Sequence, residues 1–331
     1  MNLIRSKSCS VPWVVLVKLK ELLAHPSRQL GTLIGLLFLI VFFWILTPHF
    51  LTVSNLLNVA QQTAINAIIA VGLTFVIITA GIDLSVGSIL AFSGVVLASA
   101  LSAGMPIPVA ITLGVLVGLA CGSINGLLIA YGKLPPFIST LGMMSVARGA
   151  ALMYTNGRPI SGFSAEFRFL ATGEIFSIPT SIVIMIVVYI VAHFILTKTK
   201  LGRYVYAIGG NEEAARLSGI NVAAYKIIVY GICGLLSGLA AVILTARLNS
   251  AQPIAGIMYE LDAIAATVIG GTSLMGGEGR VMGTLIGALI MGVLRNGLNL
   301  LGVSSFLQQT IIGSVIIIAV LVDMTLKRRK N

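Results

Sequence analysis

Polar side chains inside apolar stretches are the residues of this sequence that could do chemistry, because a polar group in an apolar medium needs a partner or a wet path. Asp83 is the most notable, since it stands between two apolar runs in Gly81-Ile82-Asp83-Leu84-Ser85. Its carboxylate could contact a ligand or an ion, or it could stabilise a broken helix, and Ser85 could cap the helix that follows. The other candidates for a polar path are Asn66, Asn125, Asp262, Asn296 and Asn299, and Gln61, Gln62 and Arg295 share their setting.

The sequence contains no arrangement of residues that is typical of an enzyme or of a metal site. Its histidines, His25, His49 and His193, are scattered, and its three cysteines have no spacing that suggests metal binding or a disulfide framework. A phosphate-binding loop of the GxxxxGK[ST] type is missing, because Leu134 follows Gly132-Lys133. We therefore expect no catalytic residues, no metal, no cofactor and no ATP binding by this chain itself, which makes a membrane enzyme a weak alternative.

The composition indicates a helical membrane protein. The 331 residues are 57% hydrophobic and 9% charged, whereas soluble domains carry about 25% charged residues. The apolar runs are continuous rather than alternating, and several approach the roughly 20 residues that a helix needs to cross a bilayer. The net charge of +11 comes from residues between these runs and at the two ends, which is typical of topology signals rather than of nucleic-acid binding. The sequence therefore predicts an all-α, polytopic transmembrane bundle.

The positions of the basic residues predict the orientation of this bundle. They dominate residues 1–29, 198–226 and 327–331, and loops rich in Lys and Arg stay on the cytoplasmic side. We expect a cytoplasmic segment 1–29, a transmembrane domain 30–326 and a basic cytoplasmic tail 327–331. The predicted spans, about ten in number, are residues 30–46, 59–79, one ending near 103, 107–131, 137–154, 180–197, 227–246, 261–274, 281–300 and 306–326. Of these, the fifth span is interrupted by Arg148 and the eighth is short.

Residues 198–226 form a polar island on the predicted cytoplasmic side. Gly209-Gly210-Asn211 predicts a turn. Glu212 to Leu217 predicts a short helix with acids in its first turn, where the helix dipole favours them, and Gly219 predicts its end. This segment is either an ordinary loop or a part that another protein holds.

Glycines recur at helical spacing. Gly114, Gly118, Gly122 and Gly126 lie every four residues, which predicts a helix face that a neighbouring helix can approach closely. Gly234 with Gly238, and Gly283 with Gly287, are shorter versions. Residues 86–91 also resemble residues 282–287, and each stretch follows a Gly-rich break. Broken helices in matching positions are typical of transport paths, although chance similarity explains this repeat equally well.

Several of these motifs resemble one family. Glu213-Ala214-Ala215 followed by Gly219 resembles the "EAA…G" loop of binding-protein-dependent ABC importer permeases, without the hydrophobic-Pro ending of that loop. Residues 81–88 are similar to the GIDLSVGS signature of bacterial sugar permeases of this class, 202–221 to its middle loop and 270–280 to its third signature. Residues 260–266 and 296–303 resemble the ribose-type branch, and the match runs from about residue 52 to residue 323.

The resemblance implies a multi-pass permease of the bacterial inner membrane that imports a monosaccharide, most closely ribose. It implies three partners: an ATPase with two nucleotide-binding cassettes, a periplasmic sugar-binding protein and a second copy of the permease. We expect the outside loops 155–178 and 247–260 to contact the binding protein. The alternative is an ion-coupled secondary transporter with Asp83 as its coupling site. The resemblance assigns ATPase coupling to Gly209, Gly210, Asn211, Glu212, Glu213, Ala214, Ala215, Arg216 and Gly219.

Overall fold

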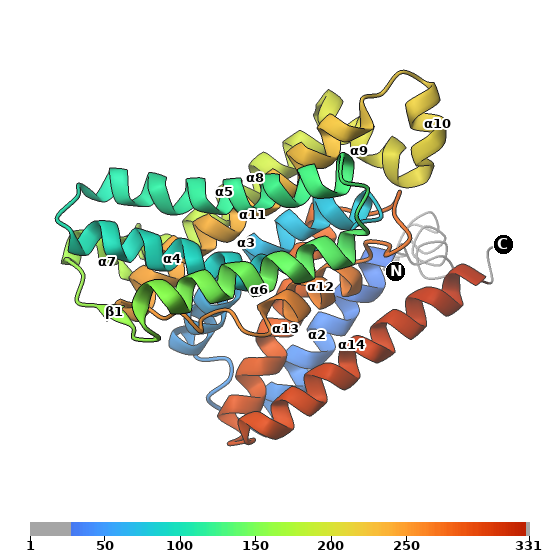
Figure 1. Ribbon diagram of the computed structural model, residues 1–331. Coiled ribbons are helices and arrows are strands. Elements are labelled where there is room, and N and C mark those ends of the chain that lie inside the picture. The colour runs from blue at the N-terminus through green and yellow to red at the C-terminus, as the bar shows by residue number, and fades with distance from the viewer. Residues whose placement is uncertain (1–27, 329–331) are drawn as a thin grey trace, which may run out of the picture.

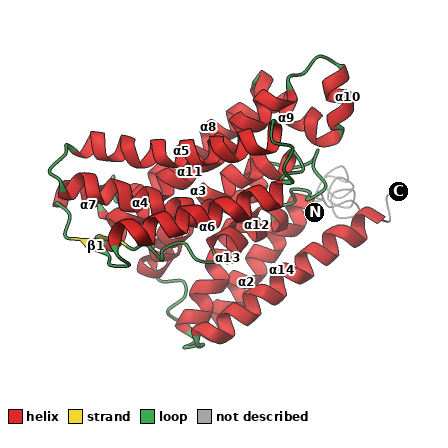
Figure 2. Ribbon diagram, in the orientation of Figure 1, coloured by secondary structure: helices red, strands yellow, loops and turns green. Residues whose placement is uncertain are grey.

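The computed structural model describes residues 28–328, and nearly every element in this range is a helix (Figures 1 and 2). Residues 1–27 of the expected N-terminal segment 1–29 and residues 329–331 of the expected tail 327–331 lie outside the described residues. The helices that make up the body of the bundle are α2 (Arg28–Leu46), α3 (Val53–Ile78), α4 (Val86–Ser102), α5 (Ile107–Ala130), α6 (Pro136–Thr155), α8 (Thr180–Lys198), α11 (Val222–Leu248), α12 (Tyr259–Ile269), α13 (Val281–Leu300) and α14 (Ser305–Arg328).

The shorter elements lie at the two ends of the bundle (Figure 1). Helices α9 (Lys200–Gly210) and α10 (Glu212–Leu217) lie at the end where α2 starts and α14 finishes. The opposite end holds α7 (Ala165–Thr172) and two antiparallel strand pairs. These pairs join β1 (Ile160–Ser161) to β4 (Ser250–Ala251) and β2 (Glu174–Ile175) to β3 (Ile178–Pro179).

Five helices of the described range are long and apolar enough to cross a membrane: α3, α5, α8, α11 and α13. Shorter apolar helices cover residues 30–46, 86–102 and 305–318. Exposed leucine, isoleucine and phenylalanine side chains, such as Phe38, Ile45 and Phe194, cover the outside of the bundle. This arrangement is that of a helical membrane protein, because apolar side chains can face lipid without cost.

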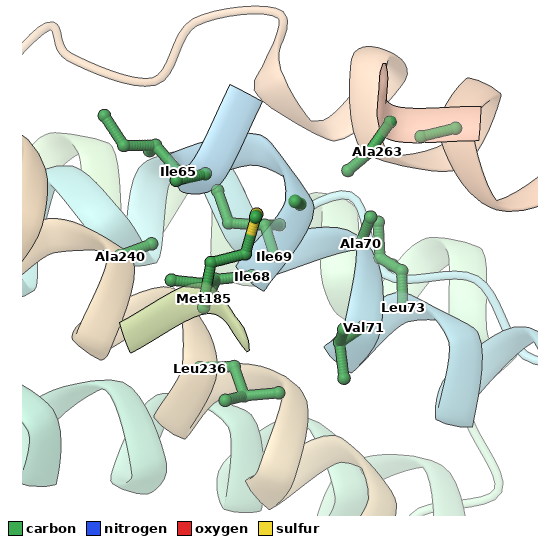
Figure 3. Close-up of a cluster of buried hydrophobic side chains, with 14 of the residues drawn as sticks. Ile65, Ile68, Ile69, Ala70, Val71, Leu73, Met185, Leu236, Ala240 and Ala263 are labelled. Carbon is green, nitrogen blue, oxygen red and sulfur yellow. The ribbon is translucent and has the colours of Figure 1, made fainter. Parts of the chain in front are cut away.

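Helix α3 occupies the centre of the bundle. From Ala67 to Ile78 all of its residues are buried. Figure 3 shows Ile65, Ile68 and Ile69 of this helix beside Met185 of α8 and Leu236 of α11. A helix that is apolar on all sides is expected at such a central position. The elements that surround α3 are therefore the ones that can position a site against it.

Three glycines of the longest predicted face pack α5 against α11, whereas Gly114 lies against Leu97 of α4. A Cβ atom on Gly118 would collide with the backbone of Gly234, and one on Gly122 would collide with the Tyr230 carbonyl. A Cβ atom on Gly126 would lie 2.6 Å from the Ile227 Cα. Absent side chains let the two backbones approach closely, which favours van der Waals contact between helices in a membrane.

Two predicted loops contain more structure than the sequence suggested. Within 155–178, Ser164 begins α7 by accepting a hydrogen bond from the Phe167 amide at 3.4 Å, and the Phe167 side chain is buried. Within 247–260, residues 250–251 form β4, and Gly256 lies against Gly87 at the start of α4. The eighth predicted span, 261–274, is wrong in its bounds, because α12 ends at Ile269 and an irregular segment follows it.

Candidate functional site

Helix α10 has the bounds that the sequence predicted. The Asn211 side chain accepts a hydrogen bond from the Ala214 amide at 2.9 Å, so Asn211 caps the helix. Glu212 and Glu213 occupy the first turn. Gly219 has a φ of +83°, which permits the left-handed exit from the helix. The predicted turn at 209–211 is wrong, because Gly209 and Gly210 form the last turn of α9 and only Asn211 leaves the helix.

A cluster of charges holds α10 against the start of α11. Lys226 Nζ lies 2.8 Å from Glu212 Oε2, and Arg216 reaches Glu212 at 3.3 Å and Glu213 at 2.9 Å. Such exposed pairs contribute little individually, on the order of 0–1 kcal/mol each. The Lys226 pair joins α10 to α11, whereas both Arg216 pairs lie within α10.

The outer surface of α10 is apolar at one point. The Leu217 side chain is 81% exposed although it lies beside charged residues. Sequence reasoning missed Leu217, whose signal is an apolar residue at the end of an otherwise polar helix. Next to α10 lies a cavity of about 730 Å³ between this helix and the turn that joins α5 to α6. Its walls include Tyr131, Lys133, Pro135, Glu212, Arg216 and Lys226.

Asp83, Ser85 and Asn125 come together in one fully buried polar cluster. Asp83 Oδ1 accepts hydrogen bonds from the Ser85 amide at 2.9 Å and from the Ser85 hydroxyl at 2.5 Å. Asn125 Nδ2 donates to Ser85 Oγ at 2.9 Å, and Ser139 Oγ donates to Asn125 Oδ1 at 3.4 Å. The cluster links the break between α3 and α4 to α5 and α6. The predicted capping by Ser85 is wrong, because its hydroxyl donates to Asp83 and makes no capping bond.

Asn66 and Asp262 meet in a second cluster, which includes Arg295. Asp262 Oδ2 accepts from Arg295 Nη2 at 2.6 Å and from Asn66 Nδ2 at 3.3 Å. The cluster ties α3 to α12 and α13. Asp262 is buried, whereas the Arg295 side chain is 42% exposed. A partly exposed charge pair between three helices can hold them in register and present a polar group to a passing solute.

The remaining path candidates lie apart from both clusters. Asn296 exchanges two hydrogen bonds with Asn55 of α3, at 2.9 and 3.0 Å. Asn299 Oδ1 accepts from Gln308 Nε2 of α14 at 2.7 Å. These contacts pair amides between helices, so the structure does not gather the predicted path residues along one passage.

Arg148 interrupts the apolar run of α6 for a structural reason. Its Nη1 donates at 2.7 Å to the carbonyls of Pro253 and Ala255. The arginine thereby holds the irregular segment that precedes α12. Non-helical backbone can lie inside a membrane bundle only where such partners satisfy its polar groups.

Comparisons with known proteins give a consistent result. Residues 55–320 match the family described as the permease component of the branched-chain amino acid transport system. The ribose import permease protein of Escherichia coli K12 is 53% identical over 88% of this chain and 92% of that protein. The ribose import permease protein of Bacillus subtilis is 53% identical over 89% and 92%. The D-allose transport system permease protein of Escherichia coli K12 is 41% identical over 90% and 92%. No solved structure matches.

Proposed function

This chain belongs to the family of permease components of the branched-chain amino acid transport type, and from this premise we propose that it is the permease of an ATP-driven ribose importer. The observation that carries the proposal is the match to ribose import permeases at 53% identity over most of both chains. The D-allose permease is less similar. Family membership and the apolar helices place the chain in the bacterial inner membrane as a multi-pass protein.

The proposed topology has ten spans, formed by α2, α3, α4, α5, α6, α8, α11, α12, α13 and α14. An even number of spans brings both termini to one side, and the basic segments 1–29, 198–226 and 327–331 favour the cytoplasm. Breaks at 79–85 and 270–280 interrupt the path from α3 to α4 and from α12 to α13. This topology places α10 inside the cell and α7 outside it.

The ATPase engages this permease, in the proposal, at α10 and the adjoining cavity. Leu217 supplies an exposed apolar contact, and charged residues surround it. A buried apolar anchor within a polar rim is the usual arrangement at a protein interface. The ATPase with two cassettes supplies the hydrolysis that this chain does not perform. The periplasmic sugar-binding protein contacts the outer end around α7 and β4, and a second permease copy completes the complex.

Transport measurements test the substrate and the energy source together. The purified chain is reconstituted in vesicles with its ATPase and binding protein, and uptake of labelled ribose is followed. We expect uptake that requires ATP and the ATPase, with excess unlabelled ribose competing better than allose or leucine. Uptake that persists without the ATPase and follows an ion gradient would instead establish the secondary transporter with Asp83 as its coupling site.

The docking surface is tested by Leu217→Asp. A carboxylate at this position would be desolvated by a partner, so we expect at least about a tenfold loss of copurifying ATPase while membrane insertion persists. Phe176→Asp is the matched control, because Phe176 is equally prominent, at 96% exposure, but lies at the opposite end of the bundle. Equal retention of the ATPase by both variants would argue against docking at α10.

A further inference from the structure

Gly209, at the end of α9, is packed where no side chain fits. A Cβ atom built on Gly209 would collide with the Ile78 carbonyl and lie 2.6 Å from the Gly277 nitrogen. A Cβ atom on the neighbouring Gly210 would meet nothing within 4 Å. The two glycines therefore differ: Gly209 is packed against the end of α3 and the segment before α13, whereas Gly210 is exposed.

The atoms around Gly209 belong to both breaks in the helical path. Ile78 is the last residue of α3, immediately before the break that contains Asp83. Gly277 lies in the irregular segment between α12 and α13. The Gly277 amide donates to the Ile78 carbonyl at 2.9 Å. One hydrogen bond thus joins the two breaks, and Gly209 packs against both residues that make it.

Tyr206, one helical turn before Gly209, makes a second link. Its hydroxyl donates to the Gly279 carbonyl at 2.6 Å. Burial raises the pKa of the Tyr206 phenol, so this group stays protonated and remains a donor at neutral pH. The same face of α9 therefore contacts the end of α3 and the segment 276–280 together. We call this group of contacts, made by Tyr206, Gly209, Ile78, Gly277 and Gly279, the clasp.

Helix α9 is well suited to move the clasp as a unit. It is a single helix of 11 residues that Thr199 caps, with the Thr199 hydroxyl accepting from the Gly202 amide. Only Asn211 separates it from α10. A displacement of α10 therefore moves α9. Because Gly209 is in close backbone contact with Ile78 and Gly277, no free space between them can absorb that movement.

We propose that Gly209 and Tyr206 are positioning residues that transmit movement of α10 to both breaks in the transmembrane path. The inference rests on the proposed function, because α10 must be moved by an ATPase. It separates the predicted coupling residues into two groups with different tasks. Residues 211–219 form the docking surface, whereas Gly209 lies behind that surface, packed against Ile78 and Gly277.

The test compares Gly209→Ala with Gly142→Ala in the reconstituted transporter. A methyl group at 209 must push α9 away from Ile78 and Gly277, whereas one at 142 on α6 meets nothing within 4 Å. We expect Gly209→Ala to bind the ATPase normally and to hydrolyse ATP, but to take up at least about tenfold less ribose per ATP hydrolysed. Gly142→Ala should keep the ratio of the unaltered protein.

Tyr206→Phe tests the same inference with a variant that keeps the ring and removes only the hydroxyl. We expect a smaller loss of ribose taken up per ATP, about threefold to tenfold, because one hydrogen bond is lost. Unchanged ratios in both variants would overturn the inference. Loss of ATPase binding by Gly209→Ala would also overturn it, since Gly209 would then belong to the docking surface. Failure of the unaltered protein to transport ribose would instead overturn the proposed function.

Discussion

Several buried polar residues of this chain form hydrogen bonds that connect different helices. Asp83 Oδ1, Ser85 and Asn125 form one chain of hydrogen bonds across the α3–α4 break and α5, and Asp262 accepts from Arg295 and Asn66. Each group would be costly in an apolar bundle without those partners. The two bonds that Asp83 Oδ1 accepts from Ser85 show how this carboxylate supports the broken helix.

The first prediction concerns Ser85. Ser85→Ala removes the hydroxyl donor to Asp83 Oδ1, which keeps the amide of residue 85, and it leaves the buried Asn125 Nδ2 without its acceptor. We expect a loss of about 1–3 kcal/mol in the free energy of unfolding. Thermal unfolding in detergent measures it. Ser145→Ala is the control, because its hydroxyl is exposed and bonds only within its own helix; an equal effect of both variants would contradict the support role of Ser85.

The second prediction concerns the pair of Arg295 and Asp262. Arg295→Met leaves the Asp262 carboxylate buried with Asn66 as its remaining side-chain donor. We expect a destabilisation of about 1–2 kcal/mol, below the 3–5 kcal/mol of a fully buried pair, because the Arg295 side chain is 42% exposed. Combining Arg295→Met with Asp262→Asn should recover part of this loss. Additive effects of the two substitutions in a double-mutant cycle would show that the contact carries no coupling.

Glycines, which have no side chain, position the helices of this bundle as much as polar side chains do. Helices α5 and α11 meet through facing glycines, and α12 meets α13 at Gly283 and Gly287 in the same manner. The predicted helix faces were correct because glycines at four-residue spacing fall on one side of a helix. The partner of each face could not be predicted, since spacing within one helix carries no information about its neighbour.

The third prediction tests the α5–α11 contact. Gly122→Leu must separate the backbones of α5 and α11, because even a Cβ atom at 122 collides with the Tyr230 carbonyl. We expect several-fold less monodisperse protein in size-exclusion chromatography. Gly149→Leu on α6 is the matched control, since a Cβ atom there meets nothing within 4 Å. Normal recovery of Gly122→Leu would contradict close packing of these helices.

The two ends of the molecule carry different structural elements. Helix α10 and the clasp lie at one end, and α7 with the strand pairs lies at the other. Central α3 connects these ends, with the part-buried Asn66–Asp262 contact near its middle and Ile78 in the clasp. The contacts of the clasp therefore connect the end that holds α10 to the central helix of the bundle.

The fourth prediction tests this polarity in the membrane. Single cysteines replace Phe176 and Leu217, which are 96% and 81% exposed, in a chain that carries Cys9→Ser. The native Cys121 and Cys233 are buried and should not react. A membrane-impermeant maleimide should label Phe176→Cys in intact spheroplasts, and Leu217→Cys only after lysis. Labelling of Leu217→Cys from outside would invert the proposed topology.

The amino-acid sequence by itself determined the class of this protein, the glycine faces and the bounds of α10. These features depend on apolar run length, helical periodicity and local capping at Asn211 and Gly219, all of which are local properties. Only the tertiary structure decided that Ser85 meets Asn125, that Arg148 holds the segment before α12, and that Gly209 packs against Ile78 and Gly277. Those pairings join residues distant in the chain, and the packing of helices, rather than any local pattern, brings them together.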